Sequence, residues 1–331
     1  MMKLLQWRYG LILLPFTLWF PSNAQALTCQ VDSFVSPNLG TITLGNANNA
    51  SVEQTLTYSC TNTSNVTQWA SVCIGADGST NNTSQINPRH MIGRNGSKLN
   101  FNMTLNGMSN ATWGNRIVGG TEFIDFFSVA PGTTTPTIKE TIIRVSLLPN
   151  NNAAKADDYT ANFTVSNAAL TYVTVDSSND TSRCLSETQG TSPFSFTVQA
   201  TVVNECKITN PPTNINLGNV SANRLNIGGS NSIGVTCTNA TPYTIGLVPS
   251  NKSLAGAGVM TGTTSNSDMI PYQLHSADGK AWGAPTTESL GNGVAGNGNG
   301  AAQNHTVYVT VPNTDVTPDS YSDRVTVTVY Y

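Results

Sequence analysis

The feature that most constrains the fold is an internal repeat, because two diverged copies of one pattern fix both the number of domains and their boundary. Cys29 and Cys60 are 31 positions apart, and Cys206 and Cys237 are separated by the same interval. In each half the second cysteine closes a stretch of alternating apolar residues and is followed by Thr-Asn. The chain is therefore predicted to contain two domains of one fold.

Further markers recur in the same order in both halves. The matched positions are Leu39-Gly40 with Leu217-Gly218, Met91 and Trp113 with Met260 and Trp282, Asp157 and Tyr159 with Asp319 and Tyr321, and Phe163 and Val165 with Val325 and Val327. Short alternating segments separated by Asn, Gly, Pro and Thr clusters, without helical periodicity, are typical of antiparallel sandwiches. We expect an all-β chain of two immunoglobulin-like β-sandwich domains.

One stretch between the two halves, 194–202, alternates without a break. Its apolar positions are Phe194, Phe196, Val198, Ala200 and Val202. Such a pattern predicts a strand with one buried face, and it provides a last strand for an N-terminal domain at 27–203. We expect this domain to be closed by its own strand.

The C-terminal domain, 204–331, has no comparable segment after its final alternating stretch. Val325, Val327, Val329 and Tyr331 would lie on one side of that stretch. An apolar strand edge left open in this way is an aggregation hazard unless another strand pairs with it. The second sandwich is therefore predicted to lack its last strand and to accept one from another chain in a groove along these four residues.

Composition and the N-terminal segment indicate export. Lys3 and Arg8 precede an apolar run at 9–20, and Ala24-Gln25-Ala26 follows as a small-x-small cleavage site. This pattern predicts a signal peptide at 1–26. Only 10% of the residues are charged and the net charge is -3, which argues against a nucleic-acid partner.

Six cysteines in an exported chain favour three disulfides over thiol chemistry or zinc binding. Six cysteines allow 15 connectivities. The shared spacing of 31 pairs Cys29 with Cys60 and Cys206 with Cys237. Cys73 and Cys184 are then paired by elimination.

At this point both halves resemble the spore coat protein U (SCPU) domain, the pilin-like module of archaic chaperone-usher pili. The two-domain arrangement resembles a tip adhesin of the Csu type. The resemblance is carried by the strand before Cys206, the Cys-Thr-Asn repeats, Met260, Tyr272-Gln273-Leu274, Trp282-Gly283 and the segment Asp319-Ser320-Tyr321-Ser322-Asp323.

The resemblance implies a set of partners. In that family each pilin lacks its final strand, a periplasmic chaperone fills the gap, and the N-terminal extension of the next subunit then replaces the chaperone at the outer-membrane usher. Here 194–202 occupies the donor position but is tethered to the domain it would complete, and only Leu27 and Thr28 precede Cys29 in the expected mature chain. We expect an exported pilus subunit at the fibre tip on the cell surface, which attaches to an abiotic or host surface and supports biofilm formation.

The loops expected at the far end of the first domain, 61–69, 106–136 and 166–175, are rich in apolar residues. Clustered apolar tips could bind surfaces, as the resemblance also implies, although several of these residues could equally face the core. The predicted surface-binding residues are Val66, Trp69, Met108, Ile117, Val118, Phe126, Phe127, Ala168, Ala169 and Leu170.

An enzyme is not expected. His90, His275 and His305 have no nucleophile or metal-spaced partner nearby in the sequence, and no phosphate-binding glycine loop occurs. The stretch 176–180 lacks the remaining ligands of a calcium loop. No cofactor and no metal is predicted. Two alternative functions stay open: a glycan-binding fimbrial lectin, and a structural minor pilin or coat protein.

Overall fold

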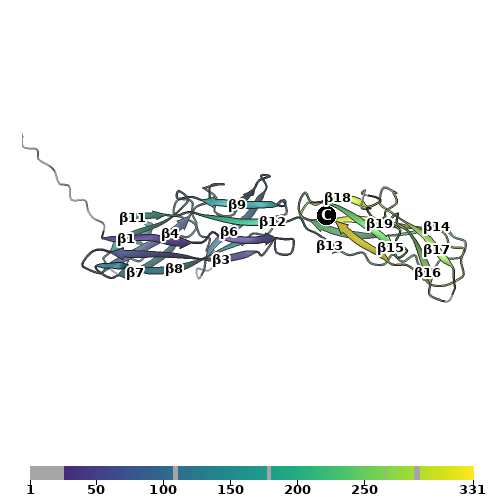
Figure 1. Cartoon of the computed structure of the whole chain (residues 1–331), viewed down its shortest axis with the longest axis horizontal. Coiled ribbons are helices and arrows are strands. Elements are labelled where there is room, and N and C mark those ends of the chain that lie inside the picture. The colour runs from purple at the N-terminus through teal and green to yellow at the C-terminus, as the bar shows by residue number, and fades with distance from the viewer. Residues whose placement is uncertain (1–25, 107–110, 177–179, 265, 287–290) are drawn as a thin grey trace, which may run out of the picture.

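The computed structural model describes residues 26–106, 111–176, 180–264, 266–286 and 291–331. These residues form two β-sandwich domains arranged end to end (Figure 1). The regular elements of this part are strands, apart from one turn of 3-10 helix, η1 (Arg183–Leu185). The all-β prediction is confirmed. No helix in the described ranges is long and apolar enough to cross a bilayer, and nearly all of the predicted signal peptide lies outside them.

The first domain consists of an eight-stranded sheet packed on a four-stranded sheet. In spatial order, the larger sheet contains β1 (Leu27–Phe34), β3 (Ser51–Asn62), β8 (Thr133–Leu147), β6 (Lys98–Leu105), β5 (Arg89–Gly93), β9 (Asp157–Phe163), β12 (Phe196–Val202) and β2 (Asn38–Ile42). The smaller sheet contains β11 (Gly190–Pro193), β10 (Ala168–Val175), β4 (Gln68–Ala76) and β7 (Phe123–Val129). Strand β12 pairs antiparallel with β9 and parallel with β2.

The second domain repeats this plan with fewer strands. Its larger sheet contains, in spatial order, β13 (Cys206–Asn210), β14 (Leu225–Cys237), β19 (Ala302–Asn313), β17 (Met269–His275), β16 (Ala257–Gly262) and β20 (Tyr321–Ser322). Its smaller sheet contains β18 (Val294–Asn297), β15 (Pro242–Pro249) and β21 (Val325–Tyr330). Each domain has its own hydrophobic core.

The three predicted disulfides are confirmed. Cys29–Cys60 and Cys206–Cys237 each join the first strand of a domain to the long strand beside it. Cys73–Cys184 ties β4 to the turn η1. This third disulfide lies in a small separate cluster, in which Val173 and Val175 are also buried.

Hydrogen bonds establish which positions of the two domains are equivalent. The indole Nε1 of Trp113 donates to the carbonyl oxygen of Ile74, and the indole Nε1 of Trp282 donates to that of Ile245, both at 2.9 Å. Ile74 and Ile245 therefore occupy the same place, so β15 is the counterpart of β4. Both tryptophans are buried and belong to the shared architecture.

The end of the repeat differs from the sequence match. Gly93 pairs with Tyr159 and Gly262 with Tyr321, at an offset of 162 between the copies. On the smaller sheet, however, Ile74 pairs with Leu170 and Ile245 with Val329, at an offset of 159. The turn at 164–167 accounts for the difference of three residues, so the match of Val165 with Val327 is wrong: Val327 pairs with Leu247 where Ala168 pairs with Ala76.

The domains are joined by three residues, Val203, Asn204 and Glu205. The Glu205 carboxylate accepts a hydrogen bond from the backbone amide of Leu44 at 2.6 Å. The Thr238 hydroxyl donates to the carbonyl oxygen of Val203 at 2.9 Å, and the Asn239 side-chain amide donates to that of Ala153 at 2.8 Å. Strand β12 therefore leads almost directly into the next domain.

Candidate functional site

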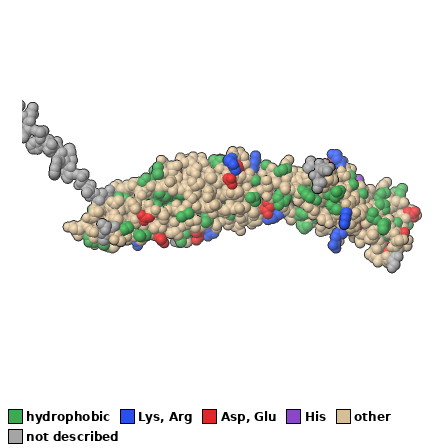
Figure 2. Space-filling model, viewed as in Figure 1, with side chains coloured by type: hydrophobic (Ala, Val, Ile, Leu, Met, Phe, Trp, Pro, Cys, Tyr) green, Lys and Arg blue, Asp and Glu red, His purple; other side chains and the backbone are tan. Residues whose placement is uncertain are grey.

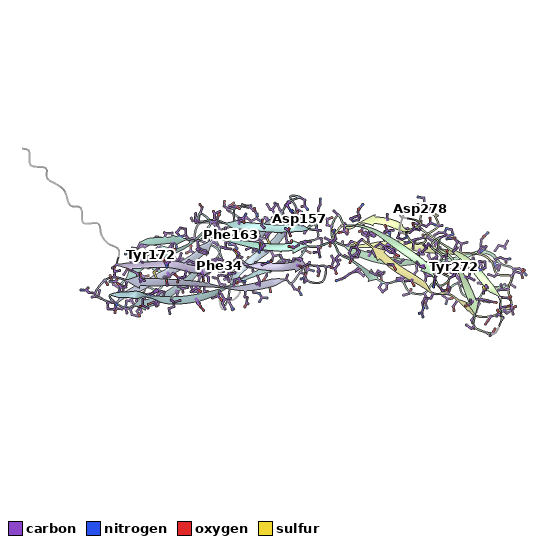
Figure 3. All side chains as sticks on the ribbon, viewed as in Figure 1. Phe34, Asp157, Phe163, Tyr172, Tyr272 and Asp278 are labelled. Carbon is purple, nitrogen blue, oxygen red and sulfur yellow. A yellow bond between two sulfur atoms is a disulfide. The ribbon has the colours of Figure 1, made fainter. Side chains whose placement is uncertain are left out.

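The closing strand of the first domain, β12, and the residues just before it bury a row of apolar side chains in the core. The side chains of Phe194, Phe196, Val198, Ala200 and Val202 are all less than 10% exposed. The ring of Phe196 stacks on Phe163 with centroids 4.3 Å apart and meets Phe34 edge-on at 4.8 Å. Figure 3 labels Phe34 and Phe163 within the body of the domain. The strand thus completes the core as well as the sheet.

The place that β12 occupies can be located in the second domain. Ile92 pairs with Thr160 and Thr261 with Ser322, so β20 is the counterpart of β9. The turn of β2 also recurs: the amides of Gly40 and Gly218 donate to Asn38 and Asn216, both at 2.8 Å, with φ of 71° and 72°. A positive φ favours glycine at both turns.

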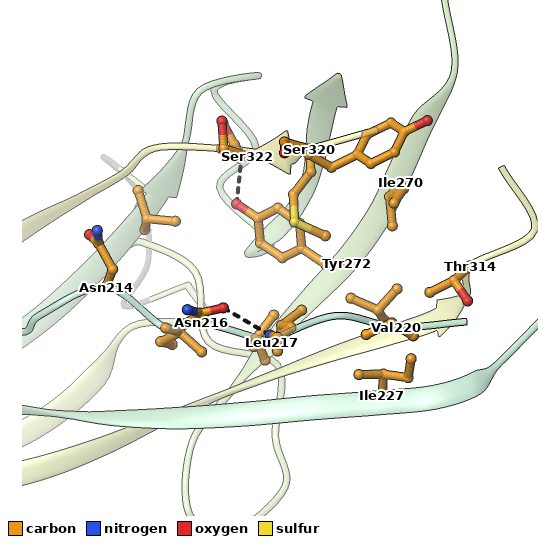
Figure 4. A pocket seen from close by; sticks show the side chains of 18 of the residues that line it. Asn214, Asn216, Leu217, Val220, Ile227, Ile270, Tyr272, Thr314, Ser320 and Ser322 are labelled. Atoms are coloured by element: carbon orange, nitrogen blue, oxygen red, sulfur yellow. Dashed lines mark hydrogen bonds between the residues drawn. The ribbon is translucent and has the colours of Figure 1, made fainter. Parts of the chain in front are cut away.

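Among the described residues of the second domain, no strand lies between β20 and the turn at Gly218. Strands β20 and β21 each end their sheet, so the side of each that faces away from β16 or β15 has no strand neighbour there. A groove of about 980 Å³ runs along them (Figure 4). Its apolar lining consists of Ile215, Leu217, Val220, Ile227, Ile233, Leu247, Met260, Ile270, Tyr272, Leu274, Val307, Val309, Val311, Val316, Tyr321, Val325 and Val327.

Several of these side chains are core residues without full cover. Leu217, Val325 and Val327 pack against the second core but are only partly buried. In the first domain, Phe163 and Ala161 beside β12 are at most 1% exposed. Figure 2 shows apolar side chains at the surface of the second domain. Covering them would remove apolar surface from water, which is favourable.

Two carboxylates add polar chemistry to the groove. Asp323 accepts a hydrogen bond from the Tyr272 hydroxyl at 2.6 Å, and burial together with this bond raises the pKa of Tyr272. Asp319 accepts hydrogen bonds from the backbone amide and hydroxyl of Thr264, which lower the pKa of Asp319 to about 2. Asp319 and Asp323 both line the groove.

The four predicted groove residues fare differently. Val325 and Val327 line the groove. Val329 is not part of the lining; it pairs with Ile245 and packs against the core. Tyr331 is 63% exposed and is not part of the lining, so its assignment is wrong.

Most of the groove was missed from the sequence. Ile215, Leu217 and Val220, which lie between β13 and β14, form one wall, and Met260 and Tyr272 lie on β16 and β17 of the larger sheet. The first wall could have been found, because Leu217-Gly218 aligns with Leu39-Gly40, and β2 borders the closing strand in the first domain. The second wall depends on strand order, which alternation within one strand does not reveal.

Of the predicted surface-binding residues, three are core residues and those assignments are wrong. Phe127, Ala168 and Leu170 are 6%, 3% and 0% exposed. They lie on strands β7 and β10, on the faces that point into the sandwich. Their neighbours Phe126 and Ala169 are partly buried, and Met108 lies outside the described residues.

The remaining predicted residues are accessible but do not share one end. Val66 is 56% exposed and Trp69 is 36% exposed, near the start of the described chain, where Leu27 pairs with Asn62. Along β10, Trp69 pairs with Val175 whereas Ala76 pairs with Ala168. The turn before Ala168 therefore lies roughly 23 Å from Trp69 at the usual strand rise, so the expected single cluster of loops is wrong.

The predicted surface residues that remain accessible on the first domain belong to two separate features. Trp69 stacks on Phe126 with ring centroids 5.1 Å apart and planes 5° from parallel. Ile117 is 87% exposed and Val118 is partly exposed, on a turn whose Arg116 guanidinium donates to the Thr171 hydroxyl of β10 at 2.7 Å.

Comparison with known proteins places these features in context. Residues 192–328 match the family model of the Spore Coat Protein U domain, so the predicted resemblance is confirmed for this part of the chain. The matched segment includes β12 together with almost the whole second domain. No curated protein matches the sequence.

Three solved structures are similar over most of the chain. The tip adhesion subunit CsuE of Acinetobacter baumannii, in a complex with the chaperone CsuC, is 16% identical over 92% of this chain and 100% of that chain, with a TM-score of 0.45. The CupB6 tip adhesin of Pseudomonas aeruginosa is 9% identical over 92% and 94%, with a TM-score of 0.35. CfaE, the adhesive subunit of CFA/I fimbria of enterotoxigenic Escherichia coli, is 12% identical over 90% and 93%, with a TM-score of 0.33. Likenesses this distant leave function to be argued from the groove.

Proposed function

We propose that this chain is the exported tip subunit of an archaic chaperone-usher pilus, which attaches cells to surfaces through its first domain and supports biofilm formation. One observation carries the proposal. The same groove is filled by β12 in the first domain and is open over about 980 Å³ in the second. The second domain is thus built to accept a strand that the described chain does not supply to it.

The occupant is a β-strand because the groove combines an apolar floor with open strand edges. Added strands gain main-chain hydrogen bonds at such edges, and alternate side chains enter the pockets below. In the first domain five alternating side chains of 194–202 are buried in the core in this way. A periplasmic chaperone would supply the strand before assembly, and a neighbouring pilin would replace it at the usher.

The tip position is supported by the use of β12. This strand lies just before Cys206, where a subunit of this kind would carry the strand it donates, yet it closes its own first domain. The first domain therefore needs no partner strand. Its outer surface, including the end opposite the second domain, is left for attachment (Figure 1).

The groove is tested by supplying a strand. The mature chain, diluted from denaturant, should aggregate alone and stay soluble when a peptide of alternating apolar residues is present at a concentration above its Kd. A control peptide with the same composition in scrambled order should not rescue it. A stable, soluble monomer formed without any peptide would contradict an open acceptor domain.

Attachment is tested on the residues that remain exposed. Val66→Asp and Ile117→Asp should each reduce retention of bacteria on polystyrene at equal pilus number, because each removes an apolar contact of about 1.5 to 3 kcal/mol at most. Val35→Asp, a change at a residue 65% exposed on the same domain, is the matched control. Unchanged retention in both test variants would contradict the apolar mechanism.

A glycan-binding tip is the second candidate, and the stacked pair of Trp69 and Phe126 favours it. An exposed aromatic face is a suitable platform for a sugar ring because it is apolar and flat. Retention on glycan-coated beads that falls with Trp69→Ser, while retention on polystyrene does not, would support this candidate.

A further inference from the structure

One of the two groove carboxylates, Asp323, lies where the first domain has an apolar residue of the strand that borders β12. Along the closing strand of the first domain, Val198 pairs with Ala161. Because Thr160 and Ser322 are equivalent, the counterpart of Ala161 is Asp323. A strand inserted in the same register would therefore place one side chain opposite a carboxylate.

The residue beneath this position is also more polar in the second domain. Met91 pairs with Leu99 and Met260 with Ile270, so the counterpart of the fully buried Phe101 is Tyr272. The Tyr272 ring lies directly against Gly258, where an added Cβ would be 2.0 Å from the ring. Tyr272 is thereby held in a fixed place, with its hydroxyl on Oδ2 of Asp323.

The Asp323 carboxylate still has capacity to accept hydrogen bonds. It receives one from the Tyr272 hydroxyl at 2.6 Å and one from the backbone amide of Arg324 at 2.7 Å. A carboxylate has about four acceptor sites. An inserted strand would cover it, and burying a carboxylate is costly unless it is paired or hydrogen-bonded.

We propose that Asp323 and Tyr272 select the strand that fills the groove: the side chain opposite Asp323 carries a hydrogen-bond donor, a hydroxyl or an amide, within an otherwise apolar alternation. The inference rests on the proposed function and specifies its partner. A strand with valine there, such as this chain's own β12, leaves the carboxylate short of a partner. The pair thus also disfavours insertion of β12 from a second copy of the chain.

A cycle of two peptides and two proteins tests this selection. The peptides have the sequence of residues 194–202, one unchanged and one with Val198→Ser. The proteins are the full mature chain and its Asp323→Ala variant, which reproduces Ala161 of the first domain. Each labelled peptide is added during dilution from denaturant, and its Kd is measured by fluorescence anisotropy.

The mature chain should bind the serine peptide about tenfold more tightly than the valine peptide, and Asp323→Ala should abolish or reverse this preference. Tyr272→Phe, which keeps the ring and removes the hydroxyl, serves as a second variant if Asp323→Ala does not fold. It leaves the carboxylate with one donor fewer, so it should enlarge the serine preference.

Failure of this inference and failure of the proposed function give different results. Equal preference in the mature chain and the variant overturns the selection by Asp323 and leaves the acceptor groove standing. Absence of binding by both peptides to both proteins overturns the acceptor groove and, with it, the selection.

Discussion

Removal of the closing strand should unfold the first domain. We predict that the fragment 27–203 folds by itself and that the fragment 27–190, which lacks β12 and all but the first residue of β11, does not. The five core side chains of the missing segment, Phe194, Phe196, Val198, Ala200 and Val202, are 9%, 4%, 0%, 3% and 8% exposed. Core residues that pack against this strand, such as Ala161 and Phe163, would become exposed to water.

The size of the effect follows from this burial. At the usual area rates these side chains contribute roughly 8 to 12 kcal/mol, an upper figure because the unfolded chain already buries some surface. Domains of this kind are stable by about 5 to 15 kcal/mol. Loss of the strand therefore removes most or all of the stability.

A single substitution gives a graded version of the same test. Phe196→Ala should lower the free energy of unfolding of 27–203 by about 3 to 5 kcal/mol, because a large buried ring is deleted. Gln199→Ala, on the exposed face of the same strand, should change it by less than about 0.5 kcal/mol.

Urea denaturation followed by tryptophan fluorescence is a suitable assay, because the ring of Trp113 lies 6.1 Å from that of Phe196. A cooperative, monomeric fold of 27–190 would refute the reasoning. Equal effects of Phe196→Ala and Gln199→Ala would refute it as well.

Two further predictions concern buried polar groups. Arg89→Met should destabilise the first domain by about 3 kcal/mol or more in urea denaturation, because the buried guanidinium donates to the carbonyl oxygens of Ala76, Asp77 and Trp113, which would lose their partner; a stability equal to that of the unchanged domain would contradict this. Burial lowers the pKa of His305, which lies 2.8 Å from the Tyr243 hydroxyl, so its stabilising effect is complete above the unfolded pKa of about 6.5. That effect is lost as the pH falls below 6.5 and through the lowered pKa of His305 in the folded state. The Tm of the peptide-bound chain should therefore drop between pH 7.5 and pH 5. His305→Gln should reduce this drop.

The sequence by itself determined the local and repeated features of this protein. Alternation within a stretch such as 194–202 fixes which side chains share a face, because successive residues of a strand point to opposite sides. The spacing of 31 residues between cysteines fixed two disulfides, since both copies must close the same loop. The repeat then gave two domains and the likeness to the SCPU family.

Only the tertiary structure decided which faces are covered and which residues meet. From the sequence, Phe127 and Leu170 could be exposed loop residues, but in the structure both are buried in the core of the first domain. Trp69 and Ala168 lie at opposite ends of the paired strands β4 and β10, so the length of these strands separates them. The sequence of the loops does not reveal this distance.

The groove depended most on long-range structure. Its walls come from segments near 217, 260 and 325, which meet because the strand order of the first domain recurs, in the described residues, without counterparts of β2, β11 and β12. The position of Asp323 opposite an inserted strand follows from comparing the strand register of the larger sheets of the two domains. Beyond Asp323 the offset between the two copies changes by three residues, which obscures the equivalence of these positions in the sequence. Burial and register are set by contacts between distant segments, and these contacts form only when the chain packs.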